Sequence, residues 1–167
     1  GISTAEKKAV RTAADGLVGH FISDDGKLGV LVEVNCETDF VTKTEDFQKF
    51  VKDMTEVVRD AAPADMEGLM ASKFGGGTVQ EAQTALTAKI GEKLGVRRFS
   101  RLAADGTKKL AQYIHAGSKI GVVVSFDDPN GKLDTTTARE VAMHVAAMNP
   151  QYVRRDDVPQ DVVAKEK

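Results

Sequence analysis

The residues of this 167-residue sequence that could do chemistry are three histidines, one cysteine and scattered acidic pairs. His20, His115 and His144 lie far apart, and no two have the i, i+4 spacing of a helical metal pair. Cys36 is the only cysteine, and its acidic neighbours would raise the pKa of its thiol, which opposes a nucleophilic role. The sequence has neither a phosphate-binding loop nor a Gly-x-Ser-x-Gly nucleophile motif. We therefore expect no enzyme activity, no catalytic residue, no metal ligand and no cofactor.

The composition argues against two classes of partner. The 23 basic and 25 acidic residues give a formal net charge of −2, whereas domains that bind nucleic acid are usually basic. Aromatic residues make up 5% of the chain and tryptophan is absent, which argues against a base-stacking surface. No apolar run approaches the roughly 20 residues of a membrane helix, and residues 1–8 do not resemble a signal peptide. We therefore expect neither nucleic acid nor a membrane as partner, and the single cysteine favours a reducing compartment.

The connector at residues 35–41 places an aromatic residue beside an acidic one, between a predicted strand and a predicted helix. In one interpretation, Phe40 packs as a hydrophobic staple before a helix cap at Thr42. In the other, Asp39 and Phe40 project as an apolar wedge with a charge beside it. The residues alone favour the packed interpretation and leave the second one open.

His144 lies at the edge of an apolar stripe in the predicted helix 135–148. An edge histidine can cover the core or contact a partner, and the first is the commoner role. The residues of the stripe share helical spacing; they are Ala138, Val141, Ala142, Val145 and Met148.

Hydrophobic periodicity and turn residues predict the elements that position these side chains. Alternate residues from Leu28 to Val34 are expected to face a core. Both long helices of the first half open with capping-box spacing. In chain order the predicted elements are a helix at 4–15, strands at 17–23 and 27–35, a helix from the Thr42–Glu45 box to Pro63, a short helix at 64–72, a glycine joint at 75–77, a helix from the Thr78–Glu81 box to a stop at Gly95, a strand at 96–102, strands at 109–115 and 119–126, a helix at 135–148 and a last helix from 157.

The two predicted hairpins repeat one another. Residues 21–34 align without gaps to residues 113–126, at a constant offset of 92. We therefore predict an α+β fold of two related subdomains, each a small antiparallel sheet covered by amphipathic helices. The first subdomain, at 1–106, has three strands. The second, at 107–167, has a hairpin and a helix, and we expect it to be incomplete.

Two features predict that the chain is part of a longer protein. There is no initiator methionine, and the sequence opens directly into helix-forming residues. The second subdomain also lacks a candidate for its third strand. An unpaired sheet edge invites pairing with another chain, so a homodimer is a further expectation.

Four segments resemble the motifs of the translation elongation factor Ts family, in the order in which that family has them. They are VEVNCETDFV at 32–41, KIGE through VRR at 89–98, IHAGSKIGV at 114–122 and AMHVAAMNP at 142–150. The resemblance implies a pair of related α+β subdomains and a guanine-nucleotide exchange factor for the GTPase elongation factor Tu. It also implies a place in the bacterial cytoplasm or in the stroma or matrix of an organelle. The resemblance covers the core region of the family, and the family's N-terminal helical domain and C-terminal part have no counterpart in this sequence.

The resemblance also implies which residues contact the GTPase. The family's Thr-Asp-Phe-Val segment enters a cleft between helices of the nucleotide domain of elongation factor Tu and disturbs its Mg²⁺ site. A histidine in the Met-His-Val-Ala motif faces the same partner, and an Ile-Gly pair lies at the contact with another domain. The matching residues of this sequence are Thr38, Asp39, Phe40, Val41, His144, Ile120 and Gly121.

An alternative of another class is a ribosome- or RNA-associated structural module without exchange activity. Its contact would be the basic strand that carries Arg97, Arg98 and Arg101, which would bind RNA phosphates.

Overall fold

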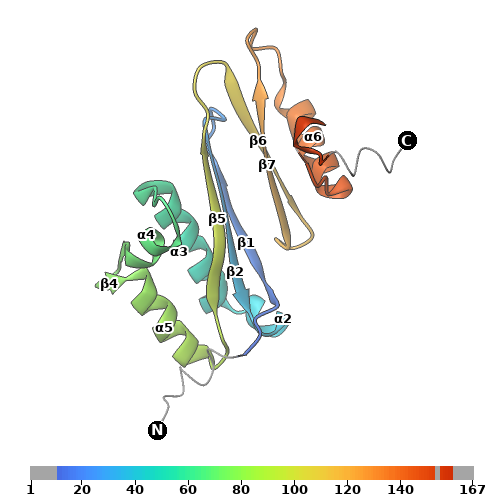
Figure 1. Cartoon of the computed structure of the whole chain (residues 1–167). Helices are drawn as coiled ribbons and strands as arrows, with labels where there is room; N and C mark the ends of the chain where they lie inside the picture. Colours follow the sequence, from blue (N-terminus) through green and yellow to red (C-terminus); the bar gives the residue numbers. More distant parts are fainter. Residues whose placement is uncertain (1–10, 153–154, 160–167) are drawn as a thin grey trace.

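The computed structural model describes residues 11–152 and 155–159, and it has an α+β architecture of small antiparallel sheets packed against helices (Figure 1). This confirms the predicted fold class. The elements in chain order are β1 (Asp15–Ile22), β2 (Leu28–Cys36), α2 (Asp39–Thr42), α3 (Glu45–Ala61), α4 (Met66–Ala71), β3 (Lys73–Phe74), β4 (Gly77–Thr78), α5 (Val79–Ile90), β5 (Gly95–Ala103), β6 (Lys108–His115), β7 (Ile120–Asp127), α6 (Thr135–Met148) and the 3-10 turn η1 (Arg155–Asp157).

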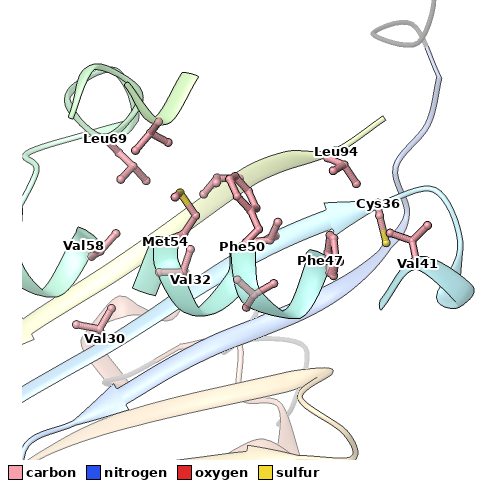
Figure 2. Packing of buried hydrophobic residues seen from close by; sticks show 14 residues of the cluster. Val30, Val32, Cys36, Val41, Phe47, Phe50, Met54, Val58, Leu69 and Leu94 are labelled. Carbon is pink, nitrogen blue, oxygen red and sulfur yellow. The ribbon is translucent and has the colours of Figure 1, made fainter. Parts of the chain in front are cut away.

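The main core lies between helix α3 and a three-stranded antiparallel sheet of order β1-β2-β5. Val30, Val32 and Val34 are fully buried on one face of β2, as the alternation of the strand predicts. Figure 2 shows Val30 and Val32 on the face of β2 that is covered by α3, whose Phe47 and Met54 are fully buried. The central strand is therefore fixed by packing, and its C-terminal end has a defined direction.

The start of α3 differs from the prediction. The prediction of a capping box formed by Thr42 and Glu45 is wrong. Thr42 ends the separate four-residue helix α2, and its hydroxyl donates to the Asp39 carbonyl (2.6 Å). Thr44 is the N-cap instead, and its side chain accepts from the Phe47 N–H (3.3 Å). Several threonines precede the helix, and spacing alone does not choose among them.

The capping box of Thr78 and Glu81 at the start of α5 is confirmed. The helix ends at Ile90 rather than just before Gly95, because Gly91 takes the left-handed conformation (φ 87°) that closes a helix. Of the glycines at 75–77, predicted as a joint, Gly75 and Gly76 form the turn between the two-residue strands β3 and β4, and Gly77 begins β4.

The prediction of a helix at 4–15 lies mostly outside the described residues. Within the described part, residues 11–14 have no helix and β1 begins at Asp15. The predicted last helix from residue 157 also lies outside them, except for Asp157 itself, which ends the 3-10 turn η1, and residues 158–159, which are not helical. Within the described residues, no helix is long and apolar enough to cross a bilayer.

The second half consists of the antiparallel hairpin β6–β7 with α6 packed on it. In the described residues, β7 pairs with β6 alone, so this sheet has two strands. Helix α6 buries Ala138 and Ala142, but Val141 and Met148 of the predicted stripe are exposed, which corrects the prediction for those two residues. A narrow two-stranded sheet covers only the small-residue face of the helix.

The two hairpins lie side by side (Figure 1), and two main-chain hydrogen bonds between them are reciprocal. The Val18 N–H donates to the Ser118 carbonyl (2.7 Å), and the Leu110 N–H donates to the Gly26 carbonyl (2.8 Å). The offset of 92 residues found in the sequence relates the two donors, Val18 and Leu110, and the two acceptors, Gly26 and Ser118, so the two bonds are equivalent. The interface is therefore of the isologous kind that relates two copies by a two-fold axis, here within one chain.

The same symmetry governs the side-chain packing between the hairpins. A Cβ at Gly29 would lie 3.1 Å from the Val123 side chain, and one at Gly121 would lie 3.0 Å from the Leu31 side chain. Glycine at both equivalent positions lets the hairpins approach closely. The hairpin β6–β7 thus covers the face of β2 opposite α3. The boundary at residues 106 and 107 between subdomains stays a prediction.

Candidate functional site

The connector between β2 and α3 presents one aromatic side chain to solvent. Phe40, in helix α2, is 82% exposed, the largest value among the exposed apolar side chains of the described residues. Its neighbours Val41 and Thr42 are 7% and 3% exposed. Helix α2 is therefore anchored through its buried face and carries Phe40 on its outer face. The packed interpretation of Phe40 is wrong, and the projecting one describes the structure.

Helix α2 has four residues, too few for a helix that is stable by itself, so other parts of the chain must hold it. The Glu92 carboxylate, in the loop between α5 and β5, accepts three hydrogen bonds from the connector. The donors are the N–H groups of Glu37 (3.1 Å) and Thr38 (3.0 Å) and the Thr38 hydroxyl (2.7 Å). In return, the Glu37 carboxylate accepts from the Lys93 N–H (2.7 Å). These bonds fix the chain just before α2.

Asp39, the first residue of α2, is held by a second set of contacts. Its carboxylate lies 2.8 Å from the Lys119 ammonium, 3.3 Å from the Lys43 ammonium and 3.1 Å from the Thr42 hydroxyl. Hydrogen bonds from Lys119, Lys43 and Thr42 lower the pKa of Asp39 from 3.8 to about 2. The site therefore has a carboxylate that is ionised at neutral pH, beside an exposed aromatic ring.

Cys36, at the end of β2, is a structural residue. Its side chain is fully buried and its thiol donates to the Thr38 carbonyl (3.2 Å). Burial, and then the negative charges of Glu92 and Asp15, raise the pKa of the thiol from 9.0 to about 11. The thiol is neutral at physiological pH and supports the connector, as the sequence indicated.

The remaining candidates of the second hairpin have different surroundings. Ile120 is 45% exposed and directly follows Lys119, so it lies near the Asp39 end of the connector. Gly121 lies between the hairpins, where a Cβ would come within 2.8 Å of the Val18 side chain. The close packing of the two hairpins is enough to explain why position 121 is a glycine, and this explanation needs no contact with another protein.

His144 belongs to a separate surface. It is exposed on α6, one turn from Val141 and Met148, which are 40% and 65% exposed. Helix α6 lies on the outer side of the β6–β7 hairpin, away from α2 (Figure 1). The structure thus brings Thr38, Asp39, Phe40, Val41 and Ile120 to one region and leaves His144 in another.

Sequence reasoning did not single out Glu92 and Lys119, the two residues that fix the connector. Both lie in segments that carry the family resemblance, but their partners are 54 and 80 residues away in the chain. Hydrophobic periodicity contains no information on contacts between residues so far apart in the chain. Only the fold shows it.

The basic strand β5 gives little support to an RNA-binding surface. The Arg98 guanidinium donates to the Glu33 carboxylate (2.5 Å), and Arg97 lies 4.0 Å from the same group. Arg101 donates to the Arg59 carbonyl (3.1 Å). Glu33 offsets part of the positive charge that phosphates would bind.

Comparison with known proteins shows the family of this chain. A sequence model of the family described as Elongation factor TS matches residues 37–167, which include α2 and α6. Elongation factor Ts of Nautilia profundicola is 45% identical over 170 residues, covering 100% of this chain and 55% of that protein. The protein of the same name from Cupriavidus necator is 47% identical over 163 residues, covering 98% of this chain and 52% of its own length.

The chain thus spans about half the length of the curated relatives that it matches. The region matched by the family model holds the projecting Phe40, the bracing residues Glu92 and Lys119, and the hairpin β6–β7. The alignment with the Nautilia profundicola protein also covers the first hairpin, β1–β2. The resemblance found in the four motifs is confirmed, and the chain belongs to the elongation factor Ts family.

Proposed function

We propose that this chain promotes the release of GDP from elongation factor Tu, as a guanine-nucleotide exchange factor in translation elongation. The observation that carries the proposal is Phe40, 82% exposed on a short helix that is braced from two sides. An exposed aromatic side chain on a fixed support is typical of an anchor residue in a protein interface. Its bacterial relatives favour the bacterial cytoplasm as the place of action.

Phe40 acts as a wedge between helices of the GTPase. Moving an exposed phenylalanine into an apolar cleft contributes roughly 1.5–3 kcal/mol. Because Phe40 packs little against its own protein, the chain gives up little core packing when the ring inserts. This free energy stabilises the opened form of the partner, in which GDP is held less tightly.

Each residue of the segment has its own part. Thr38 fixes the entry to α2 through Glu92, and Val41 anchors the helix in the core. Asp39 brings a negative charge close to the region of the partner's Mg²⁺ ion. A GTPase holds GDP partly through Mg²⁺, so a disturbed Mg²⁺ site weakens the nucleotide.

The second half of the chain adds two further contacts. We assign His144 and the exposed apolar face of α6 to one of them, and Ile120 to another. Gly121 contributes by letting the hairpins pack, which sets the position of Ile120.

Exchange of this kind makes and breaks no covalent bond. If binding of the factor weakens GDP, then GDP weakens binding of the factor by the same ratio. The factor therefore speeds nucleotide exchange in both directions, and the excess of free GTP in the cell sets its outcome.

The test is the rate at which a fluorescent GDP leaves elongation factor Tu. We compare the chain with the double variant Asp39→Ala/Phe40→Ala and with Leu102→Ala, a control that removes another exposed apolar side chain (38%) far from the connector. The parent and the control should accelerate release. The acceleration by the double variant should be at least about tenfold smaller than that by the parent, given the free energy of burying one phenylalanine. Equal acceleration by the double variant would contradict the proposal.

A further inference from the structure

Two lysines occupy equivalent positions in the repeat, Lys27 in the first hairpin and Lys119 in the second. Each reaches across to the main chain of the other half. The Lys27 ammonium donates to the Lys108 carbonyl (2.6 Å), and the Lys119 ammonium donates to the Gly16 carbonyl (3.0 Å). The two acceptors are themselves equivalent under the offset of 92 residues. This shared contact is part of the interface between the hairpins.

The two lysines differ in their remaining contacts. Lys27 makes its second bond to the Gly106 carbonyl (2.9 Å), which is again main chain. Lys119 instead contacts two carboxylates, those of Asp39 (2.8 Å) and Asp15 (3.1 Å). Its bond to Asp39 has no counterpart at Lys27. The second hairpin is therefore tied directly to the helix that carries Phe40.

We propose that Lys119 is a positioning residue, which holds α2 in the orientation that presents Phe40. The partner contact made by the first half of the chain therefore needs the second half. The part that concerns elongation factor Tu rests on the proposed function. The part that concerns α2 is a property of this chain alone and is tested without a partner.

The effect of Lys119 is limited by the other groups that face Asp39. Lys43 and the Thr42 hydroxyl stay in place when Lys119 is replaced, and Asp15 loses the same ammonium partner. The Lys119 and Asp39 side chains are 38% and 49% exposed, so their ion pair is partly screened by solvent. Loss of Lys119 should loosen α2 about two- to fivefold, the range of an exposed ion pair.

The first experiment measures the isolated chain by NMR. The amides of Lys43 and Thr44 donate to the carbonyls of Phe40 and Val41, so their hydrogen exchange reports opening of α2. Lys119→Met should speed that exchange about two- to fivefold. It should also raise the pKa of the Asp39 carboxyl from about 2 towards 3.8. Lys119→Arg should restore both values.

Lys27→Met is the matched control, because it removes the equivalent lysine and the equivalent bond between the hairpins. It should leave the two amides and the Asp39 pKa unchanged. Equal acceleration in both methionine variants would mean a general loosening of the halves and would overturn the inference. In an Asp39→Asn background, Lys119→Met should have no further effect on the amides, and a full additional effect would also overturn it.

The second experiment measures GDP release from elongation factor Tu. Lys119→Met should reduce the acceleration about two- to fivefold and Lys27→Met should not. If Lys119→Met speeds exchange at the Lys43 and Thr44 amides but the parent chain does not accelerate GDP release, the proposed function is overturned and the role of Lys119 in α2 is supported. Unchanged release by Lys119→Met, with an active parent and an inactive Asp39→Ala/Phe40→Ala variant, would overturn the positioning role.

Discussion

Replacing Glu92 should release the connector before α2, because its carboxylate is the common acceptor for three donors. In Glu92→Ala, two N–H groups and one hydroxyl lose a charged partner. A hydrogen bond to a charged group contributes about 1.5–3 kcal/mol, but these groups are only partly buried and water can replace part of the loss. We therefore expect a total cost of about 2–3 kcal/mol. Glu92→Gln should cost less than about 1 kcal/mol, since its amide oxygen can accept from both N–H groups and its NH₂ can donate to the hydroxyl.

Two measurements separate this local effect from a general one. Urea unfolding gives the total change in stability, and hydrogen exchange at the amides of Glu37 and Thr38 gives the local change. In Glu92→Ala, exchange at these amides should rise at least tenfold, with a clearly smaller rise in Glu92→Gln. Glu67→Ala serves as the control, since it removes an exposed glutamate from α4. The reasoning fails if the alanine and glutamine variants behave alike, or if neither changes exchange at the two amides.

Three further predictions follow from the packing and the pKa shifts. Gly121→Ala should destabilise the chain by about 1–3 kcal/mol and Gly29→Ala by less, because the added Cβ comes within 2.8 Å of a neighbour at Gly121 but only 3.1 Å at Gly29; thermal unfolding of both variants checks the order. The Cys36 thiol should react with iodoacetamide at least about 100-fold more slowly in the folded chain than in urea at pH 8, because a pKa of about 11 instead of 9.0 lowers the thiolate fraction by that factor; equal rates would contradict the burial of this residue. Asp39 has a lowered pKa, so its ionised form stabilises the fold above the ordinary value of 3.8, and this contribution is lost as the pH falls from 3.8 to about 2; Asp39→Asn should be less stable than the parent at pH 7 and equally stable near pH 2, as unfolding curves at both pH values would show.

The strands were predictable because their signal is local. Alternation in β2 requires only that one face is buried, and Val30, Val32 and Val34 are all fully buried. The start of α3 was not predictable in the same way, because Thr42 and Thr44 both suit a cap and tertiary contacts choose between them. The prediction that Val141 of α6 is buried was wrong for a related reason. Periodicity predicts an apolar face, but the width of the covering sheet decides how much of that face is buried.

The candidate site shows the same limit more sharply. Sequence identified the Thr38–Val41 segment through its resemblance to a family, but its residue types alone favoured a packed Phe40. Phe40 faces outward on a helix that is anchored by buried Val41 and Thr42 and contacted by Glu92 and Lys119 from other elements of the fold. A short-range pattern contains no information on such contacts. Family resemblance supplied what local physics could not, since it compares whole arrangements rather than neighbours.

The repeat explains how such an arrangement can arise without loss of symmetry elsewhere. Gly29 and Gly121, and the main-chain bonds of Lys27 and Lys119, serve the same interface in both halves. Only one of the two lysines meets a carboxylate of a projecting helix, because only the first half has α2 beside the hairpin turn of the other. One ammonium group thereby joins the interface of the halves to the proposed partner contact. Removing that ammonium group should therefore weaken the presentation of Phe40 although no residue of the connector is changed, whereas removing the equivalent group of Lys27 should not.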